Sequence, residues 1–338
     1  MVCQVQFSEG SRVLVTGATG YTGHVLVRKL VEQGCHVTAI VRKTSNRAAL
    51  SDLPIQWVEG DVFDRAVVAR ATQGVEYIFH VAAAYREAKI TNETYTRVHV
   101  ESTKLLAEAV QSSPVFRRFV HVSTVGVHGH IDNPPANEEY RFSPGDVYQT
   151  TKAEAELWIR RYSVEHGLPL SVVRPAAIYG PEDRRLVKLF KMAARRFFPL
   201  FGSGAGLYHL IHVDDLTDIF ITAALHPAAL GEVFIAGNPK PSRLQDIATC
   251  IAEELGNTRL QFVRLPAWPL FAAAYVCEWL CKPFGIEPPL YRRRVAFFTK
   301  DRAFDTQKLQ EVLHYQFSVP VEEGLKATTR WYLEHRWL

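Results

Sequence analysis

Residues 12–23 read RVLVTGATGYTG, a short apolar strand that runs directly into a turn with glycine at every third position. Gly17, Gly20 and Gly23 permit a tight turn, close approach of a ligand to the backbone, and close packing of the next helix. That helix, expected over 24–33, points its free N–H groups and the positive end of its dipole at an anion. A glycine-rich turn can be merely structural, but the apolar strand before it and the helix after it predict dinucleotide binding.

The composition is that of an ordinary globular protein. The chain has 338 residues, of which 47% are hydrophobic and 22% charged, and its net charge is only +4. So mild a charge argues against a dedicated nucleic-acid binder. The 5 cysteines lack the spacing of a zinc or redox motif, and the histidines do not cluster with carboxylates, so we expect no metal site. The N-terminus lacks the pattern of a signal peptide, and we expect a cytoplasmic protein.

Apolar runs alternate with helical stretches through most of the chain. Runs that are apolar at consecutive positions are typical of parallel strands covered on both faces. Their alternation with helices predicts an α/β protein with a doubly wound parallel sheet, a Rossmann fold. Ligands bind such sheets at the carboxyl ends of the strands. The strands are expected at 12–16, 36–41, 55–59, 77–81, 119–123, 170–174, 210–213 and 232–236.

The regular alternation of strands and helices ends at about residue 181. We therefore expect a dinucleotide-binding domain at 10–180, to which 206–237 return, and a smaller substrate lobe at 181–205 and 238–338. The lobe is expected to be mostly helical, because helical patterns interrupted by proline fill its second part.

A tyrosine and a lysine one helical turn apart indicate proton-transfer chemistry. Tyr148 and Lys152 stand at i and i+4, so on a helix they share one face. A phenol needs a nearby cation to act as a base at neutral pH, and a lysine supplies that charge. Thr124 or Ser123, at the end of an expected strand, can hold a substrate oxygen against the tyrosine. Such a pair alone is commonly just a solvated helical pair, but its place after the glycine turn favours function.

The order of these motifs along nearly the whole chain resembles the extended short-chain dehydrogenase/reductase family, within the NAD(P)-dependent epimerase/dehydratase superfamily. The motifs concerned are TGATGYTG (16–23), GD (60–61), FHVAA (79–83), VSTVGVHG (122–129), YQTTK (148–152), RPAAIYGP (174–181) and HVDDL (212–216). The resemblance implies that the tyrosine is the general acid/base and that the lysine lowers its pKa and holds the cofactor ribose. It further implies that Thr124, with Ser123 second, orients the substrate, and that the protein is a homodimer.

The same resemblance assigns residues to the cofactor. It implies that the glycine turn binds the pyrophosphate, that Asp61 and Val62 bracket the adenine, and that 174–180 contact the nicotinamide side. The set it implies is Gly17, Thr19, Gly20, Tyr21, Thr22, Gly23, Asp61, Val62, Ala82, Ala83, Tyr148, Lys152, Pro175, Ala177 and Ile178. The chain departs from the family where NVxGT is usual and HVEST (99–103) stands here. We interpret His99 as a packed histidine rather than a catalytic one.

The end of the second expected strand bears on the choice of cofactor. It reads VTAIVRKTSNR (37–47), with Arg42 where an NAD-preferring site has Asp or Glu. A guanidinium matches a 2′-phosphate with two hydrogen bonds, whereas a carboxylate repels it. The alternative is an ordinary solvated basic loop. Because no acidic residue precedes Asp52 in this segment, we expect NADP, with NAD as the second choice.

Two segments bear on the substrate. Sugar-nucleotide members of the family commonly carry an arginine just before the strand that leads to VDD, but GAGLYHLIHVDDL (204–216) has Tyr208 and His209 there. Segment 265–281, LPAWPLFAAAYVCEWLC, is apolar around most of a helix, with Glu278 its only charge. It is too short and too interrupted by proline for a membrane span. We interpret it as a buried lobe helix, then as the wall of a lipophilic pocket, and last as a surface that docks on a membrane.

These features resemble the 3β-hydroxysteroid dehydrogenase and dihydroflavonol 4-reductase branch of the family. The resemblance implies reduction of a ketone, or oxidation of a secondary alcohol, on a hydrophobic steroid-, flavonoid- or terpenoid-like substrate. The alternative is a nucleotide-sugar epimerase or dehydratase with tightly bound NAD. A non-catalytic cofactor-sensing protein on the same fold is a third hypothesis. We expect His128 and His130 in a loop near the site, facing the substrate.

Overall fold

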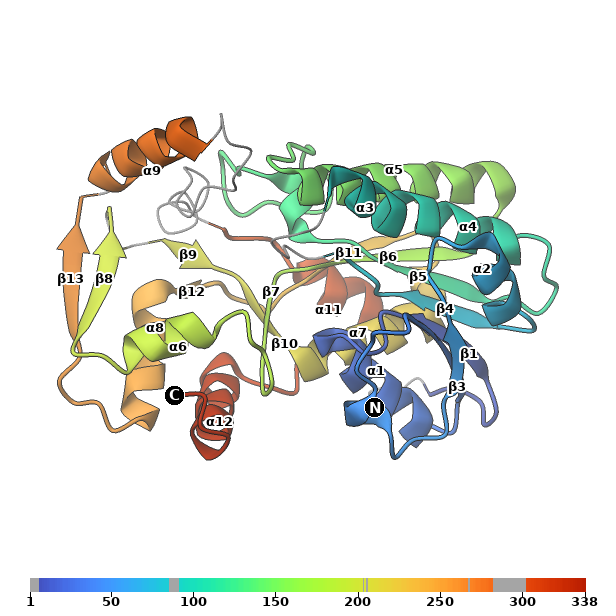
Figure 1. The fold of residues 1–338 in the computed structure, drawn as a ribbon, viewed down its shortest axis with the longest axis horizontal. Coiled ribbons are helices and arrows are strands. Elements are labelled where there is room, and N and C mark those ends of the chain that lie inside the picture. The colour runs from blue at the N-terminus through green and yellow to red at the C-terminus, as the bar shows by residue number, and fades with distance from the viewer. Residues whose placement is uncertain (1–5, 85–90, 203, 205, 267, 282–301) are drawn as a thin grey trace.

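A parallel sheet of seven strands forms the centre of the larger part of the molecule (Figure 1). The computed structural model describes residues 6–84, 91–202, 204, 206–266, 268–281 and 302–338. The strand order is β11-β6-β5-β4-β1-β2-β3, and every neighbouring pair is parallel. The strands are β1 Arg12–Thr16, β2 His36–Val41, β3 Gln56–Glu59, β4 Tyr77–His80, β5 Arg118–Val122, β6 Leu170–Pro175 and β11 Val233–Ala236. The predicted doubly wound sheet is confirmed, and its topology reverses between β1 and β4, where such sheets bind ligands.

Helices cover both faces of this sheet, which explains why its strands are apolar at consecutive positions. On one face α1 (Tyr21–Glu32), α7 (Val213–Leu225) and α11 (Gln307–Leu313) share a core with Val13 and Val15. On the other face α2 (Arg65–Ala71), α4 (Ser102–Val110) and α5 (Val147–His166) share a core with Leu14. Alternate residues of β1 therefore serve opposite faces. Short elements between them are η1 (Ala48–Leu50), α3 (Asn92–Thr96), η2 (Arg97–Glu101), η3 (Val125–His128) and η4 (Pro227–Ala229).

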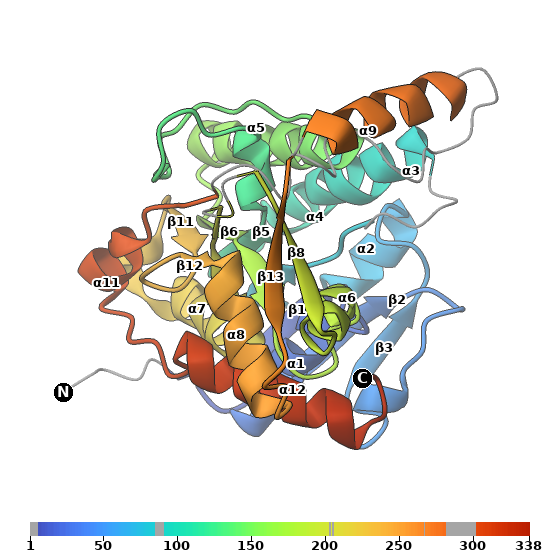
Figure 2. The ribbon, with the colours of Figure 1, turned by 90° about the vertical axis from the view of Figure 1, so that its left-hand side faces the viewer.

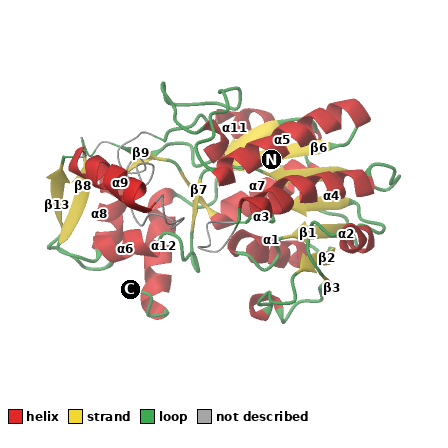
Figure 3. Cartoon of the chain, turned by 45° about the horizontal axis from the view of Figure 1, so that its top comes forward, coloured by secondary structure: helices red, strands yellow, loops and turns green. Residues whose placement is uncertain are grey.

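A smaller lobe with a core of its own lies beside the sheet (Figure 3). Helices α6 (Val187–Ala193), α8 (Leu244–Glu254) and α12 (Val321–Glu334) enclose this core, in which Phe190 and Tyr332 pack edge to face. Short strand pairs join the helices: β7 (Ala177–Tyr179) with β10 (Leu210–His212), β8 (Phe197–Phe201) with β13 (Gln261–Leu265), and β9 (Leu207–Tyr208) with β12 (Ser242–Arg243). The lobe is mostly helical, as the sequence predicts, whereas the exact domain boundaries stay a prediction.

The apolar helix α9 (Trp268–Cys281) lies at the outer edge of the molecule (Figures 1 and 2). Only Ala274 of this helix is buried, whereas Trp268 is 72% and Trp279 67% exposed. The interpretation as a buried lobe helix is therefore wrong. Its apolar residues are spread around the whole circumference, and such a pattern does not reveal whether any face is covered. No helix in the described ranges is long and apolar enough to cross a membrane.

Candidate functional site

The glycine turn is so tight that two of its positions exclude any side chain. Gly17 has φ +72°, and a Cβ atom there would lie 2.8 Å from the backbone of Ala82. A Cβ atom at Gly23 would lie 2.0 Å from the Gly17 carbonyl oxygen. Substituting either glycine would push α1 away from β1 or β4. The turn thus brings α1 directly against the point where the sheet reverses.

The N-terminus of α1 opens onto this turn. Helix α1 begins at Tyr21, earlier than the predicted 24, with Gly20 as its N-cap residue. No side chain caps the helix, and the first intrahelical bond runs from His24 N–H to the Gly20 carbonyl. The first amides of a helix have no intrahelical acceptor, so they are available to an anion such as a pyrophosphate. Thr19, half-buried, precedes this end, and the buried Thr22 is in its first turn.

Two free cations stand at the carboxyl end of β2. Arg42 and Lys43 are exposed, and within the described ranges neither side chain forms an ion pair or hydrogen bond. Arg47 differs, because its guanidinium lies 3.0 Å from a Glu59 carboxylate oxygen. Asp61 is exposed and Val62 half-buried just beyond β3. This edge of the sheet therefore offers unneutralised positive charge beside the turn after β3.

The loop after β4 is fixed to the end of β1. Thr16 Oγ1 accepts the N–H of Ala82 at 3.2 Å and lies 2.8 Å from His80 Nδ1. Because the Thr103 hydroxyl donates to the His99 carbonyl, His80 Nε2 donates to Thr103 and His80 Nδ1 accepts from Thr16. Ala82 is half-buried and Ala83 exposed, while Ala84 is buried. The two small residues predicted to line the cofactor thus lie at the reversal point between β1 and β4.

Tyr148 and Lys152 lie on the first turns of α5, above the end of β5. Lys152 is only 2% exposed, and its Nζ donates to the carbonyl oxygen of Val122 at 2.9 Å. Burial lowers the pKa of Lys152 to about 8, against the opposing effect of Glu156. The half-buried ring of Tyr148 packs edge to face with His99, with 5.4 Å between the ring centroids. A half-buried tyrosine thus stands one helical turn from a desolvated lysine.

Two hydroxyl residues follow β5 directly. Thr124 Oγ1 accepts the N–H of Gly126 at 3.1 Å and so begins the turn η3. Ser123 is buried, and its hydroxyl has no hydrogen-bond partner in the part of the chain that the structure describes. Both residues adjoin Val122, whose carbonyl oxygen binds Lys152. The four residues predicted to be catalytic therefore gather at the carboxyl end of β5.

Segment 174–180, at the end of β6 and in β7, approaches the start of α1 after the glycine turn. Pro175 is buried, and Ala177 and Ile178 are half-buried in β7. A Cβ atom at Gly180, where φ is +146°, would lie 2.8 Å from the hydroxyl of Tyr21. That hydroxyl is buried, and it has no hydrogen-bond partner among the described residues. The Tyr21 side chain therefore points at the 174–180 segment, and only its backbone remains for a pyrophosphate.

His128 does not face a substrate, contrary to the prediction. Its ring is fully buried, and its Nε2 accepts a hydrogen bond from Arg174, whose Nη1 is 3.2 Å away. The guanidinium of Arg174 also binds both carboxylate oxygens of the buried Glu156, at 3.1 and 3.0 Å from Nε. A buried arginine needs acceptors on all sides, and His128 supplies one. His130 is instead exposed, 3.5 Å from Asp132.

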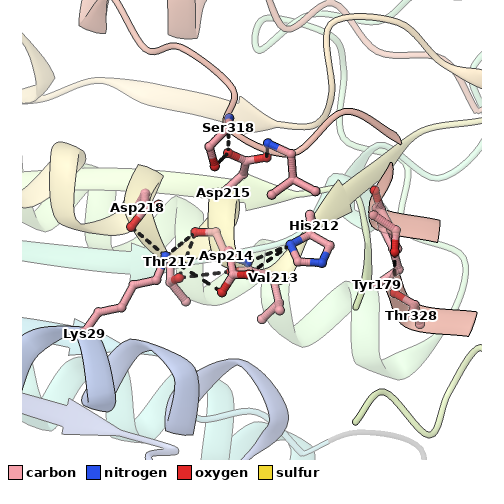
Figure 4. A network of polar contacts seen from close by, with 12 residues as sticks. Lys29, Tyr179, His212, Val213, Asp214, Asp215, Thr217, Asp218, Ser318 and Thr328 are labelled. Atoms are coloured by element: carbon pink, nitrogen blue, oxygen red, sulfur yellow. Dashed lines mark hydrogen bonds and ion pairs between the residues drawn. The ribbon is translucent and has the colours of Figure 1, made fainter. Parts of the chain in front are cut away.

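The HVDDL motif (212–216) joins segments that are far apart in the sequence (Figure 4). Asp215 is fully buried, and one of its carboxylate oxygens accepts from the Tyr315 hydroxyl at 2.9 Å and from the Ser318 amide at 2.8 Å. Lys29 of α1 donates to the Asp214 carbonyl oxygen at 2.8 Å and, just beyond the motif, to the Asp218 carboxylate at 2.7 Å (Figure 4). The motif therefore fastens α7 both to α1 and to the segment that leads into α12.

Three basic side chains on the side that faces the lobe contact other residues of the chain. His209 is buried, and its Nδ1 accepts the Phe304 amide at 3.1 Å, so it is committed to the lobe. Arg185 lies 2.6 Å from Asp183, and Arg184 stacks over Trp337 at 5.2 Å. Within the described ranges no group of His, Cys, Asp and Glu side chains is arranged to hold a metal ion.

Sequence reasoning missed two side chains that reach this site. Tyr95 of α3 packs edge to face against Tyr148, with 6.5 Å between ring centroids. Thr151, on α5 between the two proposed catalytic residues, lies 2.8 Å from His99 Nδ1. The available signal was the HVEST departure at 99–103, which the sequence analysis treated as a packing detail.

Comparisons with known proteins agree with this geometry. The profile of the NAD dependent epimerase/dehydratase family matches residues 13–237. The chain is 29% identical to the 3beta-hydroxysteroid-dehydrogenase/decarboxylase isoform 1 of Arabidopsis thaliana, over 93% of this chain and 78% of that protein. It is 27% identical to the UDP-glucose 4-epimerase of Mycolicibacterium smegmatis, over 95% of this chain and 98% of that protein. The crystal structure of gox2253 superposes with a TM-score of 0.81 at 28% identity, covering 97% of this chain and all 100% of that one.

Proposed function

Because the chain belongs to the NAD-dependent epimerase/dehydratase family and is an enzyme of the extended short-chain dehydrogenase/reductase type, we propose that it is an NAD(P)-dependent oxidoreductase. It reduces a ketone, or oxidises a secondary alcohol, on a hydrophobic ring substrate. The observation that carries the proposal is the placement of Tyr148 above the end of β5, next to Lys152, whose buried ammonium binds the Val122 carbonyl at 2.9 Å.

The residues around the glycine turn fit a dinucleotide. In this proposal the α1 amides hold the pyrophosphate, since Gly17 and Gly23 have no room for a Cβ atom and leave the backbone accessible. When bound, the nicotinamide supplies the two-electron exchange with the substrate carbon. The remaining proposed contacts are Thr19, Gly20, Tyr21 and Thr22 at the turn, Asp61 and Val62 at the adenine, and Ala82, Ala83, Pro175, Ala177 and Ile178 toward the nicotinamide.

Three side chains carry the proton chemistry. In reduction the Tyr148 hydroxyl donates a proton to the substrate oxygen, and in oxidation its phenolate removes that proton. The charge of Lys152 favours the phenolate, and it acts strongly because the lysine is desolvated. Thr124, or Ser123 in second place, donates a hydrogen bond that holds the substrate oxygen beside the phenol. The unpartnered Ser123 hydroxyl is consistent with such a reserve donor.

We infer that NADP is preferred over NAD. Arg42 and Lys43 are exposed and make no ion pair within the described ranges, so their charge is free for a 2′-phosphate. Replacing Arg42 with Ala should weaken NADPH binding about 10-fold or more, since a bidentate charge-assisted contact is lost, and leave NADH binding within about twofold. Dissociation constants from fluorescence titration measure both. Equal NADPH and NADH affinities in the wild type would contradict the preference.

Contacts of side chains in the smaller lobe support a hydrophobic substrate. His209 accepts the Phe304 amide and Arg185 pairs with Asp183, so these two side chains are already engaged, and Arg184 stacks over Trp337. A shallow hollow along α9 is lined by the apolar residues and thiols Ala272, Ala273, Val276, Cys277, Leu280 and Cys281. These observations favour the second interpretation of α9, a wall for a lipophilic molecule.

A nucleotide-sugar epimerase or dehydratase with tightly bound NAD is the second candidate. It is favoured by the similarity to the UDP-glucose 4-epimerase over 95% of this chain. The two candidates differ in whether cofactor is consumed. The purified enzyme should oxidise NADPH with cyclic ketones of steroid, flavonoid or terpenoid type and leave UDP-glucose and dTDP-glucose unchanged. Conversion of a nucleotide sugar without net cofactor turnover would establish the second candidate instead.

The assembly of the protein stays a prediction. We infer a homodimer from the family resemblance alone, and sedimentation equilibrium of the purified chain tests it.

A further inference from the structure

We propose that His99 is a positioning residue, which fixes the first turns of α5, and with them Tyr148, against the loop that follows β4. The inference rests on the proposed function, because it takes Tyr148 as the acid/base. Its evidence is a buried network of four residues, His99, Ala84, Thr151 and Tyr148, called the His99 network below.

The two ring nitrogens of His99 join different segments of the chain. Nε2 lies 3.0 Å from the backbone nitrogen of Ala84, and an amide can only donate, so Nε2 is the acceptor. The ring proton therefore sits on Nδ1, which donates to Thr151 Oγ1 at 2.8 Å. The Thr151 hydroxyl in turn donates a hydrogen bond to the Val147 carbonyl oxygen, also at 2.8 Å. The same hydroxyl also lies 3.2 Å from the Tyr148 carbonyl oxygen. Because the Ala84 amide can only donate and Nδ1 then carries the proton, the tautomer and orientation of the ring are determined.

The imidazole of His99 is uncharged and shielded from water. The His99 side chain is 1% exposed, so water cannot replace either bond. Burial, with the charge of Lys152 second, lowers the pKa of His99 to about 2. The imidazole therefore stays neutral at every pH at which the enzyme is assayed. Protonation would break the bond from Ala84, and this does not occur in that range.

The backbone around His99 forms a π-helical turn, which sets the direction of the His99 side chain. His99 lies in η2, a single π-helical turn, and such turns recur at functional sites because they redirect one side chain. The carbonyl oxygen of His99 accepts from Thr103 Oγ1 at 2.6 Å, and Thr103 in turn lies 3.0 Å from His80 Nε2. Through His80 and Thr16 the network reaches the end of β1. The glycine turn and the catalytic helix are thus joined by one continuous set of buried hydrogen bonds.

The ring of His99 also contacts the tyrosine itself. Its edge-to-face packing on Tyr148, at an interplanar angle of 83°, restricts the phenol from one side, and Tyr95 restricts it from another. The hydroxyl of Tyr148 must stay near Lys152 for its phenolate to be stabilised. Without the packing of His99, the ring of Tyr148 could turn away from Lys152. His99 therefore acts on the reaction through the position of Tyr148.

Three variants test this proposal. His99→Leu removes both hydrogen bonds, Thr151→Val removes only the hydroxyl on α5, and His99→Asn keeps one acceptor and one donor. We expect His99→Leu to lower kcat about 10- to 100-fold, as misplacement of a catalytic group by about 1 Å does. We expect Thr151→Val to lower it by a smaller factor and the pair to be non-additive. His99→Asn should restore kcat to within about fivefold of the wild type, because the donor and acceptor return.

Two readouts separate positioning from a general loss of structure. The apparent pKa in the pH profile of kcat/KM should rise in His99→Leu and Thr151→Val, because Tyr148 moves away from Lys152. NADPH affinity should weaken only a few-fold through the Ala84 loop, and the Ala84 amide should exchange hydrogen faster. The control is His209→Leu, which removes another buried, hydrogen-bonded histidine and should leave the apparent pKa unchanged.

The kcat and the pH profile of the two variants show whether His99 positions Tyr148. If His99→Leu does not fold, Thr151→Val carries the test, since it alters one buried oxygen only. A normal kcat and an unshifted pH profile in folded His99→Leu, or in Thr151→Val, would overturn the proposal. Tyr148→Phe separates it from the proposed function. If Tyr148→Phe keeps its activity, the acid/base assignment fails; if it is inactive while His99→Leu is normal, only the role of His99 fails.

Discussion

At the scale of single residues, the site depends on side chains whose chemistry is changed by burial. Lys152 and His99 are both almost inaccessible, and burial lowers the pKa of each, to about 8 and about 2. One stays charged and the other neutral at neutral pH, so they serve different purposes. Lys152 supplies a cation beside Tyr148, and His99 supplies hydrogen bonds without adding a charge.

The first prediction concerns Lys152 and pH. Below about pH 8 this lysine is charged in both the folded and the unfolded chain, and between about 8 and 10.5 only the unfolded chain keeps the proton. The unfolded state then binds more protons, so the free energy of unfolding rises with pH across this window. Relative to Lys152→Met, the cofactor-free wild type should gain up to about 3 kcal/mol between pH 8 and 10. Urea denaturation at several pH values measures the difference, and a constant difference would refute the burial effect.

Single residues also mark the limit of sequence reasoning. Tyr148, Lys152 and Thr124 could be recognised because their spacing and order carry the chemistry. The partner of His99, Thr151, is 52 residues away along the chain, so nothing local predicts the contact. His128 was expected to face the substrate, but it supplies an acceptor to the buried Arg174. A sequence does not show which buried charge a histidine must satisfy.

At the scale of elements, the strands were the most predictable part. β1 and β2 have the bounds that the apolar runs predict, and the other predicted sheet strands differ by about a residue at their ends. Parallel strands buried on both faces must be apolar at consecutive positions, so they can be recognised in the sequence. The start of α1 was misplaced by three residues, because the glycine that caps it lies inside the turn. Short strands such as β8 and β13 pair with each other and carry no such signal.

The second prediction concerns the segment that leads into α12. Asp215 accepts hydrogen bonds from Tyr315, Ser318 and Val319, and its carboxylate is fully buried. Asp215→Asn keeps the size but replaces an acceptor oxygen with a donor nitrogen, which should cost at least about 2 kcal/mol of unfolding free energy. Asp214→Asn is the control, since that side chain is 47% exposed, and it should cost less than about 1 kcal/mol. Equal effects in urea denaturation would disprove the role of Asp215.

The third prediction concerns α9. Because Trp279 is 67% exposed, Trp279→Ser should change the free energy of unfolding by less than about 0.5 kcal/mol. A buried tryptophan would cost several times more, about 3–5 kcal/mol on truncation. The comparison of the two unfolding curves distinguishes these cases. A loss in the larger range would mean that the helix is covered after all.

At the scale of the whole molecule, the sequence carries a clear pattern for the proposed cofactor side and none for the proposed substrate side. The pyrophosphate part of the proposed cofactor site is built from one βαβ unit, so its turn and its helix are adjacent in the chain. The proposed substrate side combines η3 and the lobe, and such a surface has no single pattern along the sequence. The family membership follows from the cofactor side, since the family profile ends at residue 237, before most of the lobe. For this reason the substrate class rests on chemistry of the lobe alone.

The most direct test of the central claim is a comparison of Tyr148→Phe with the wild type, using NADPH and a ketone that the wild type reduces. The phenylalanine keeps the ring that packs against His99 and Tyr95 and removes only the hydroxyl. We predict that kcat falls about 10²- to 10⁴-fold, while the NADPH dissociation constant stays within about threefold. A variant that binds NADPH normally and reduces the ketone at the wild-type rate would contradict the assignment of Tyr148 as the acid/base.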